Sequence, residues 1–355
     1  MRRGLTAGDG SAVGNGLASD ADIGVSPVVM DDALAAELLP DRPADAHKGT
    51  FGRLLVLAGS LDYAGAALLV AAAATRTGAG LVTLAVPASL QALFAGRVPE
   101  VTTLGLSERE PGIIEPDAAI VSLAGRSHQG LVVGPGLLAR SATDDLVRRI
   151  LAGEEEGSSD GEGSGDAPLA PAVVDAEALN GLARRPGWWR EARRPAILTP
   201  HPGEFARLGG ADPALGTLRP AGNEHERASA ATAGARSWGQ VVVLKGARTV
   251  IAAPDGAIAV APFANPALAT AGSGDVLSGT IGALIAQGRS PWDAARLGVY
   301  LHGMAGEALR DTFGDSGAVA SDLLGQLPLA RRRLVALRGR ARRPLGFVAS
   351  RGERS

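Results

Sequence analysis

Short apolar runs alternate with longer amphipathic stretches through most of this chain. Nine runs have the length and composition of buried strands. They are Leu54–Ala58, Leu81–Val86, Ala119–Leu123, Leu131–Val133, Ala172–Asp175, Ala196–Thr199, Val241–Leu244, Val250–Ala253 and Ala257–Ala261. The last two flank a probable Asp-Gly hairpin turn. Runs with apolar residues at helical spacing are Ala66–Thr77, Ser89–Arg97, Ala142–Ala152, Glu224–Trp238, Val276–Gln287 and Pro291–Arg310. This alternation predicts an α/β protein with a mostly parallel central sheet and helices on both faces.

The two ends and one internal segment break the alternation. Residues 1–26 are rich in small and polar residues without apolar periodicity, which predicts a disordered N-terminal extension. Residues 153–168, GEEEGSSDGEGSGDAP, predict a disordered acidic insertion before a strand. The last segment, residues 331–355, begins with the basic run RRRLVALRGRARR at 331–343. This run has none of the aromatic residues that bind nucleic-acid bases, so we expect a solvated basic helix and tail. The predicted folded domain is residues 27–330.

The composition excludes several function classes. The formal net charge is -2, so bulk electrostatics favours neither nucleic acid nor an acidic membrane surface as a partner. Because the chain has no cysteine, it has no disulfide, thiolate metal site or cysteine nucleophile. Residues 1–26 have no apolar core of signal-peptide length, and no apolar run of the chain reaches the length of a membrane span. We therefore expect a cytoplasmic protein that acts on small molecules.

The stretch Asn265–Gly288 carries the clearest candidate chemistry. Its small-residue turn, AGSG at 271–274, leads directly into Asp275 and an apolar run at helical spacing. The start of such a helix presents unpaired N–H groups and a positive dipole end, which suit a phosphate. A carboxylate beside that phosphate has an electrostatic cost unless it takes a proton from an attacking hydroxyl, so Asp275 is a candidate general base. The alternative is that these residues only cap a helix.

Further unusual residues follow the strand-like runs, at the edge where open parallel sheets bind ligands. These segments are Gly59–Ala66, Gly134–Gly136, Asp175–Asn180, Thr199–Glu204 and Lys245–Thr249. Each has an ordinary explanation as a turn or a cap, but their coincidence at one edge favours a binding site. Lys48 and Lys245 are the only lysines among 35 basic residues. Their retention indicates either chance or positions that a planar guanidinium does not suit.

The order and spacing of these motifs resemble those of the NAD(P)H-hydrate dehydratase family, which forms the C-terminal half of bifunctional nicotinamide repair proteins. The matching motifs are HKGTFGRLLVLAGS, YAGAALL, PEV at 99–101, VVGPG, VVDAEALN, ILTPHPGEFARL, VVLKGA and ATAGSGDVLSG. The resemblance implies a ribokinase-like three-layer fold. It also implies a lyase that phosphorylates the 6-hydroxyl of (6S)-NADHX or (6S)-NADPHX and eliminates phosphate, restoring NADH or NADPH. As in similar bacterial members, ADP is the expected phosphoryl donor, giving AMP, and ATP is the alternative.

The resemblance implies a role for each matching residue. Asp275 would activate the substrate hydroxyl, and the N–H groups of 272–274 would hold the transferring phosphoryl group. The nucleotide-binding residues would be Lys245, Gly246, Ala247, Arg248, Thr249, Gly272, Ser273 and Gly274. The residues facing the damaged nicotinamide would be Ala66, Gly136, His201 and Asp275. Glu204 would organise Mg²⁺ through water, because magnesium keeps much of its hydration shell.

Some positions depart from the family pattern, and two other functions stay open. Ala271 stands where the family has glycine, which is tolerable only if this residue avoids positive φ. Leu138 replaces a small residue near the expected substrate mouth. The resemblance further implies a homotetramer and a separate NAD(P)HX epimerase as pathway partner. The alternatives are a small-molecule kinase of the same fold, such as a hydroxyethylthiazole or sugar kinase, and an idle nucleotide-sensing protein.

Overall fold

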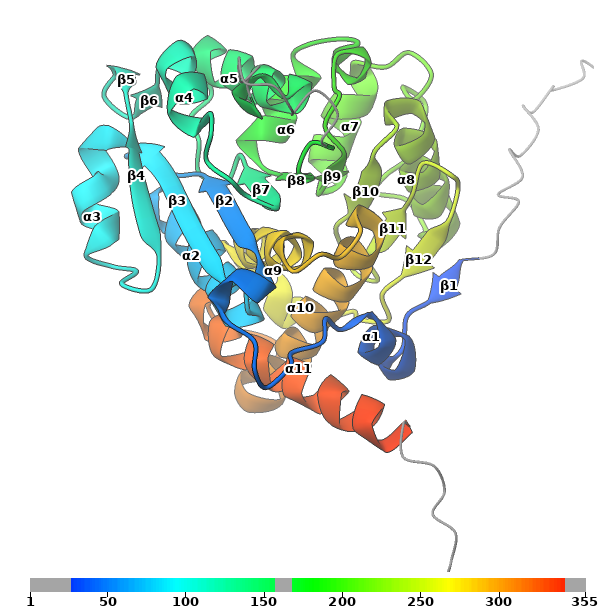
Figure 1. The fold of residues 1–355 in the computed structure, drawn as a ribbon. Coiled ribbons are helices and arrows are strands. Elements are labelled where there is room, and N and C mark those ends of the chain that lie inside the picture. The colour runs from blue at the N-terminus through cyan, green and yellow to red at the C-terminus, as the bar shows by residue number, and fades with distance from the viewer. Residues whose placement is uncertain (1–26, 157–167, 342–355) are drawn as a thin grey trace, which may run out of the picture.

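A computed structural model describes residues 27–156 and 168–341. Its centre is a 10-stranded sheet with the strand order β1-β12-β11-β10-β9-β8-β7-β2-β3-β4 (Figure 1). The strands are β1 (Val28–Val29), β2 (Arg53–Leu57), β3 (Leu81–Pro87), β4 (Thr102–Leu106), β7 (Gly130–Val133), β8 (Ala172–Val174), β9 (Ala196–Leu198), β10 (Val241–Leu244), β11 (Val250–Ala252) and β12 (Ile258–Val260). Neighbouring strands are parallel except where β11 pairs with β10 and β12. The predicted mostly parallel sheet and the Asp-Gly hairpin are therefore confirmed.

Helices cover both faces of the sheet, as predicted. One face carries α1 (Asp32–Leu38), α2 (Ala64–Thr77), α3 (Gln91–Ala95), α9 (Ser273–Ala286), α10 (Pro291–Phe313) and α11 (Ala320–Ala341). The other carries α4 (Pro116–Leu123), α5 (Ser141–Ala152), α6 (Glu177–Ala183), α7 (Pro202–Gly210) and α8 (Glu224–Trp238). Alternate strand residues feed the two cores: Leu54 and Val56 face the first, whereas Leu55 and Leu57 face the second. A small antiparallel pair, β5 (Glu108–Glu110) and β6 (Ile113–Ile114), stands apart from the main sheet.

The strand predicted at Ala119–Leu123 is wrong, because these residues belong to α4. Pro116 occupies the first turn of this helix, and the Glu115 side chain accepts a hydrogen bond from the Ala118 N–H at 3.1 Å. Both are helix-start signals. The apolar run alone is too short to distinguish a buried strand from one face of a helix.

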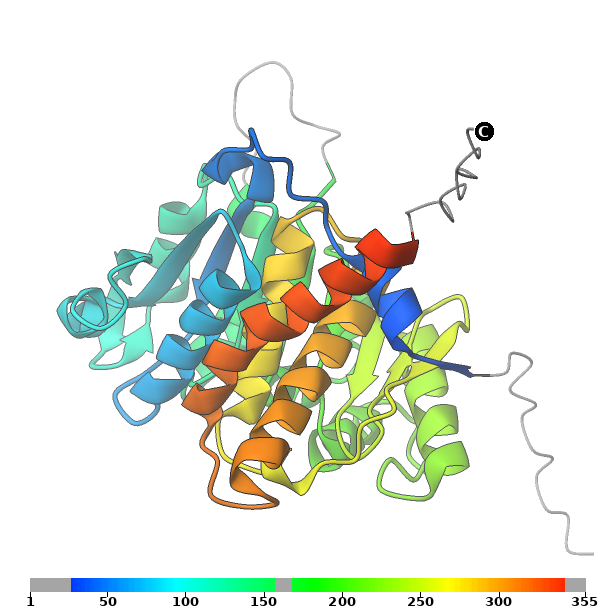
Figure 2. The same cartoon turned by 90° about the horizontal axis from the view of Figure 1, so that it is seen from below.

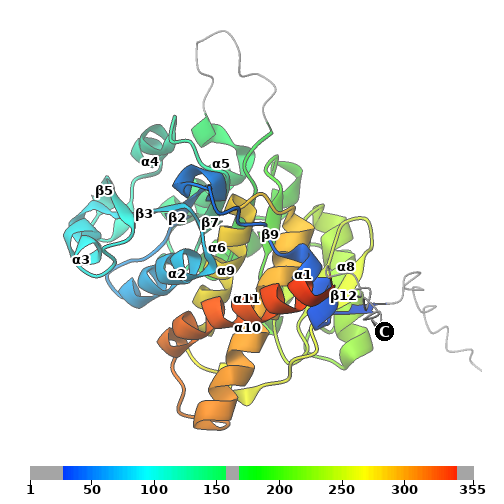
Figure 3. The same ribbon diagram turned by 60° about the horizontal axis from the view of Figure 1, so that its bottom comes forward.

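The basic run near the C-terminus continues a packed helix. Helix α11 crosses the outer side of α2, α9 and α10 (Figure 2) and reaches α1 near its C-terminal end (Figure 3). Within this run Leu334 is fully buried, and the Arg338 guanidinium donates to the Leu39 carbonyl at 2.9 Å. The domain end predicted at residue 330 therefore falls inside α11.

Part of the acidic insertion predicted to be disordered is ordered at its start. Glu154–Glu156 form a 3-10 turn, and the buried Glu155 carboxylate pairs with the guanidinium of Arg194. The insertion also begins and ends at one place, because a Cβ on Gly153 would lie 2.7 Å from Cδ1 of Leu169. The predictions of disorder for 1–26 and for the rest of the insertion lie outside the described residues, as does that of a tail beyond residue 341.

The described helices were compared with the dimensions of a bilayer. In residues 27–156 and 168–341, no helix combines the length and the apolar character needed to cross a membrane.

Candidate active site

The segments that follow β2, β7, β8, β9 and β10 meet at one edge of the sheet. These five strands are neighbours and run parallel, so their carboxyl ends lie side by side. Gly134 lies directly against the strand end of β8, since a Cβ on it would stand 1.9 Å from the Asp175 carbonyl. The expected coincidence of the strand-end segments at one edge is thus present in the structure.

Helix α9 begins at this edge with a turn that requires glycine. Gly272 is the residue before the helix and has φ of 88°. A Cβ there would lie 2.6 Å from Cδ1 of Leu69 and 3.0 Å from Cβ of Ala320, so a side chain is excluded by both conformation and space. Ala271 is not among the described residues with positive φ, which explains why alanine is tolerated in place of the family's glycine. The Gly274 N–H, in the first turn, has no hydrogen-bond partner in the described parts of the chain.

Lys245 sits between carboxylates beneath this helix start. Its ammonium lies 2.8 Å from Asp175 Oδ1 and 3.7 Å from Glu204 Oε2. The second oxygen of Asp175 accepts a hydrogen bond from the Ser278 hydroxyl at 2.6 Å, which joins the cluster to α9. A Cβ on Gly274 would lie 3.5 Å from the Lys245 ammonium. The first turn of α9 and this lysine therefore face the same space.

The charges of this cluster set the protonation of Asp275. Burial, followed by repulsion from Asp175, raises the pKa of Asp275 to about 7, and the nearby Lys245 only partly offsets this. Burial also acts to raise the pKa of Asp175. The attraction of Lys245, its hydrogen bond and further hydrogen bonds outweigh burial, so the pKa of Asp175 lies below the ordinary value. The pKa of Lys245 is raised, because attraction to Asp175 and Glu204 outweighs its burial. Asp275 is thus the carboxyl of this group suited to accept a proton near neutral pH.

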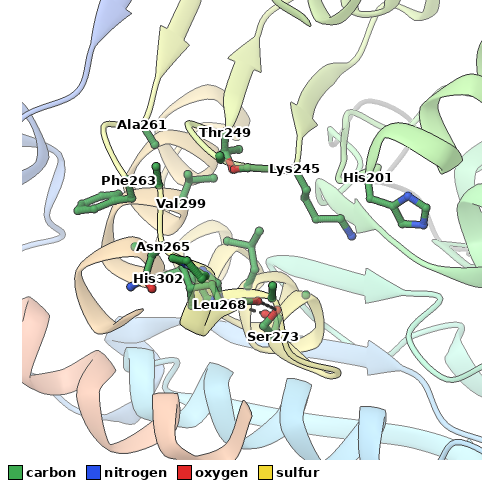
Figure 4. A pocket seen from close by; sticks show the side chains of 18 of the residues that line it. His201, Lys245, Thr249, Ala261, Phe263, Asn265, Leu268, Ser273, Val299 and His302 are labelled. Atoms are coloured by element: carbon green, nitrogen blue, oxygen red, sulfur yellow. Dashed lines mark hydrogen bonds between the residues drawn. The ribbon is translucent and has the colours of Figure 1, made fainter. Parts of the chain in front are cut away.

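A cavity of about 650 Å³ opens beside the cluster (Figure 4). Its walls come from the loop after β10, the segment after β12, and helices α9 and α10. The lining residues are His201, Pro202, Lys245, Gly246, Ala247, Thr249, Ala261, Phe263, Ala264, Asn265, Pro266, Leu268, Ala269, Ser273, Gly274, Leu277, Val299, His302 and Gly303. Phe263 and Val299 lie to one side of the Lys245 side chain, and Leu268 lies beside Ser273 (Figure 4). This volume and polarity suit a small molecule with an apolar part and a charged part.

His302 is a buried neutral residue in the cavity wall. Burial lowers the pKa of His302 to about 4, so the imidazole is uncharged near neutral pH. Its Nε2 lies 3.0 Å from the Ser273 carbonyl, and because a carbonyl only accepts, Nε2 carries the proton. The Ser273 hydroxyl donates in turn to the Leu268 carbonyl at 2.8 Å. These two bonds fix the residue that opens α9.

The structure brings most of the predicted nucleotide-binding residues into this cavity and leaves two outside it. The members that line it are Lys245, Gly246, Ala247, Thr249, Ser273 and Gly274. Gly272 is not among the lining residues, since it packs against α2. Arg248 does not line the cavity either: its guanidinium pairs with the Glu224 carboxylate at 2.6 Å, and its φ is 52°.

The predicted substrate-facing residues Ala66 and Gly136 lie against each other. Gly136 has φ of 70°, and a Cβ on it would stand 3.0 Å from Cβ of Ala66. Ala66 lies in the first turn of α2, one turn before Leu69, which contacts Gly272. Neither Ala66 nor Gly136 lines the cavity described above. The structure therefore places them at the start of α2, one helical turn before the residue that contacts Gly272.

His201 and Glu204 form the start of α7 by capping each other. The His201 Nδ1 accepts from the Gly203 N–H at 3.0 Å, and Glu204 Oε2 accepts from the His201 N–H at 2.8 Å. The imidazole is half exposed and lines the rim of the cavity. His201 and Phe263 lie on opposite sides of Lys245 (Figure 4). Burial raises the pKa of Glu204.

The donor set around Glu204 fits a hydrated metal ion better than a directly bound one. Within residues 27–156 and 168–341, no three His, Asp or Glu side chains are grouped to hold a metal. Between the carboxylates of Asp175 and Glu204 the positive charge is already supplied by Lys245. Contact between Glu204 and Mg²⁺ through water, as predicted, is compatible with this arrangement.

Several residues of the site were not singled out from the sequence. Asp175 was named only as part of a strand-end segment and was given no role of its own, although its place in the VVDAEALN motif was a usable signal. Ser278 lies one helical turn after Asp275, so helical spacing could have indicated it. Phe263 and His302 carry no local signature, because only the tertiary fold brings them to the cavity.

Comparisons with known proteins show the family of the chain. The family model described as NAD(P)H-hydrate dehydratase matches residues 54–329. The chain is 43% identical over 297 residues to the bifunctional NAD(P)H-hydrate repair enzyme Nnr of Moorella thermoacetica, covering 83% of this chain and 52% of that protein. It therefore spans about half the length of the bifunctional relative that it matches. It is 35% identical to the ADP-dependent (S)-NAD(P)H-hydrate dehydratase of Xanthomonas campestris pv. campestris, covering 83% of this chain and 93% of that protein.

A solved structure gives the same result for the fold. The ADP/ATP-dependent NAD(P)H-hydrate dehydratase of Bacillus subtilis, co-crystallised with ATP/Mg²⁺, matches with a TM-score of 0.71 and 31% sequence identity. The match covers 87% of this chain and 99% of the other, and it confirms the predicted ribokinase-like fold. Because the family model, the Xanthomonas relative and this structure all match across the strands that carry the Lys245 cluster, the chain belongs to the NAD(P)H-hydrate dehydratase family.

Proposed function

We propose that this chain is a nucleotide-dependent (S)-NAD(P)H-hydrate dehydratase, converting (6S)-NADHX and (6S)-NADPHX to NADH and NADPH. The observation that carries this proposal is the pairing of Asp275, whose pKa is about 7, with the free Gly274 N–H at the start of α9. A base and an anion-binding amide in adjacent residues are what phosphorylation of a hydroxyl requires. Relatives named as NAD(P)H-hydrate dehydratases support the choice of substrate.

The proposed reaction has two steps. Asp275 takes the proton of the 6-hydroxyl, whose oxygen attacks the terminal phosphorus of ADP, and AMP leaves. The N–H groups at the start of α9 hold the oxygens of the transferring group, and Lys245 supplies a fixed positive charge beside it. Phosphate and a ring proton are then lost, which restores the double bond of the reduced nicotinamide.

The cavity suits the nucleotide in this scheme. Its apolar side chains Phe263, Leu268 and Val299 would contact the base, and Lys245 and Thr249 would contact the phosphates. Mg²⁺ would neutralise charge on those phosphates, with Glu204 reaching it through water. Ala66, Gly136 and His201 remain the proposed contacts of the hydrated nicotinamide. A homotetramer, a cytoplasmic location and a separate epimerase remain expectations from the family resemblance.

Incubation with (6S)-NADHX and either ADP or ATP tests the proposal. Recovery of the absorbance of reduced nicotinamide, together with release of AMP from ADP, is the expected result. A stable phosphate ester without recovery of NADH would instead indicate a small-molecule kinase. Binding of ADP without turnover of any kind would indicate a nucleotide sensor.

The pH dependence of the reaction should follow Asp275. Because only the ionised carboxylate accepts a proton, kcat/KM should fall as the pH drops below about 7, by about tenfold for each pH unit. Initial rates at saturating nucleotide across this range measure the profile. A rate that stays constant down to the ordinary pKa of an aspartate, about 4, would mean that Asp275 is not the base.

Substitution of Gly274 by alanine tests the close approach of the phosphoryl group. The added methyl would meet the Lys245 ammonium at 3.5 Å, an ordinary contact, so we expect normal folding. It would nevertheless occupy the space that the transferring group needs, lowering kcat by about 10²-fold. Gly325→Ala on α11, where a Cβ meets nothing within 4 Å, is the matched control and should leave kcat unchanged. Full activity of Gly274→Ala would place the phosphoryl group elsewhere.

A further inference from the structure

Arg227 is a buried cation that lies under the loop between β10 and β11. It stands in the first turns of α8, and only 9% of its surface is exposed. Its guanidinium donates to the carbonyls of Leu244 at 3.2 Å and Lys245 at 3.4 Å, and also to that of Ala247. In the described parts of the chain, no carboxylate lies within ion-pair distance of it. Burial accordingly lowers the pKa of Arg227, with only weak opposition from Glu224.

These contacts determine which way the loop's peptide groups face. In a planar trans peptide, the carbonyl of one residue and the N–H of the next point in opposite directions. Since the Lys245 carbonyl faces Arg227, the N–H of Gly246 faces away from it, and Gly246 lines the cavity. Gly246 has φ of 149°, and a Cβ on it would lie 2.8 Å from Nη2 of Arg227, so the loop rests directly on the guanidinium.

We propose that Arg227 is a positioning residue for nucleotide binding: it turns the carbonyls of the 245–249 loop away from the cavity, so that the amide of Gly246 faces the nucleotide phosphates. This inference rests on the proposed use of a nucleotide. A carbonyl facing the cavity would repel the phosphates, whereas an N–H attracts them. The guanidinium spreads its donors over three nitrogens in a fixed plane and so reaches carbonyls of three residues, whereas the donors of a lysine all sit on one compact ammonium.

The competing explanation is that Arg227 only stabilises the fold. A buried cation without a carboxylate partner is a costly way to fill space, because an apolar side chain of similar volume would do so without losing hydration. The two explanations differ in what they predict for ligand affinity. A purely structural role lowers the melting temperature without a selective effect on nucleotide affinity.

Arg227→Met and Arg227→Lys, in the full chain, separate the two. The Kd of ADP is measured by calorimetry, and KM and kcat are measured with ADP and NADHX. We expect Arg227→Met to raise the Kd and KM of ADP by about tenfold or more, with kcat and the KM of NADHX within about threefold of wild type. Arg227→Lys should restore part of the ADP affinity, since it keeps the charge but not the fork.

Two control variants match Arg227 in part. Arg331 on α11 is a partly buried arginine that donates to the Pro40 carbonyl at 2.9 Å, so Arg331→Met should affect stability alone. Glu224 forms an exposed ion pair with Arg248, which lies in the same loop. Glu224→Gln removes this ion pair and should change the Kd of ADP by less than about threefold.

Three results would overturn the inference. These are an unchanged Kd for ADP in Arg227→Met, an equal loss of affinity for ADP and NADHX, and a Kd for Arg227→Lys no better than that of the methionine variant. If the methionine variant does not fold, a wild-type Kd for Arg227→Lys decides against it. If the wild-type chain binds ADP but does not convert NADHX, the proposed function fails, while the Kd of ADP still decides the role of Arg227.

Discussion

Replacement of Asp275 by asparagine should lower kcat by about 10²–10⁴-fold while the Kd values of ADP and NADHX change by less than about threefold. The amide keeps the size of the carboxyl and one of its two oxygens, but it cannot take a proton. The start of α9, the cavity lining and Lys245 are unaltered, so the ligands should still bind. Steady-state rates and calorimetric titration of both ligands measure the two quantities.

The same variant should be more stable than wild type in alkaline solution. Folding raises the pKa of Asp275 from its ordinary value of 3.8 to about 7, so ionisation above about pH 7 opposes folding. Asparagine avoids this cost, and its advantage should shrink as the pH falls from 7 and vanish below about 4. Asp311→Asn, an exposed position on α10, is the control and should change neither activity nor melting temperature. Turnover of Asp275→Asn within about tenfold of wild type would rule out Asp275 as the base.

Replacement of Lys245 by methionine should destabilise the protein by about 3–5 kcal/mol near neutral pH, because a buried charge cluster loses its cation. Asp175 is fully buried and Glu204 nearly so, and both depend on this ammonium for compensation. Urea unfolding measures the free energy, and calorimetry should show weakened ADP binding. The loss of stability should be smaller in acid, where the carboxyls take up protons and need no cation.

The second lysine of the chain supplies the control for this experiment. Lys48 is exposed and forms no ion pair among the described residues, so Lys48→Met should change stability by less than about 0.5 kcal/mol. Lys245→Arg keeps the charge but brings a planar group into a compact site, so it should mainly raise the KM of ADP. Equal stability of the two methionine variants would show that Lys245 does not hold the cluster together.

The sequence was sufficient for most of the sheet and for the longer helices other than α11, whose first half was not predicted. Strands β7 and β10 are short apolar runs, followed by Gly134 and by Lys245-Gly246 respectively. Helix α8 is preceded by the capping Asn223 and followed by Gly239, so the local sequence marks the limits of all three elements. The sequence did not predict β1, β6 or the seven-residue α6. Elements of so few residues are too short to show a strand or helix periodicity of apolar positions. Packing decides their structure.

The site was predicted as separate motifs, but not as a connected cluster. The helix start at Asp275 and the Lys-Gly loop could be recognised because each motif is continuous in sequence. Lys245 and Asp175 are 70 positions apart, and Asp175 and Ser278 are 103 apart. No local pattern indicates such pairs, since they arise from the adjacency of β8, β9 and β10 and from α9 packing beneath them. The pKa of Asp275 near 7 follows from that assembly and could not be foreseen.

The contact between Gly153 and Leu169 offers a practical attachment point on this enzyme. The chain leaves and rejoins the fold at that place, just before β8, whereas Asp175 and the cavity lie beyond the other end of the same strand. Because the entropy of closing a loop grows only slowly with its length, we expect a shorter or longer segment to be accepted between Glu156 and Leu169, where it leaves the buried pair of Glu155 and Arg194 intact. A fluorophore or surface tether introduced there would label or immobilise the protein without touching the reacting groups.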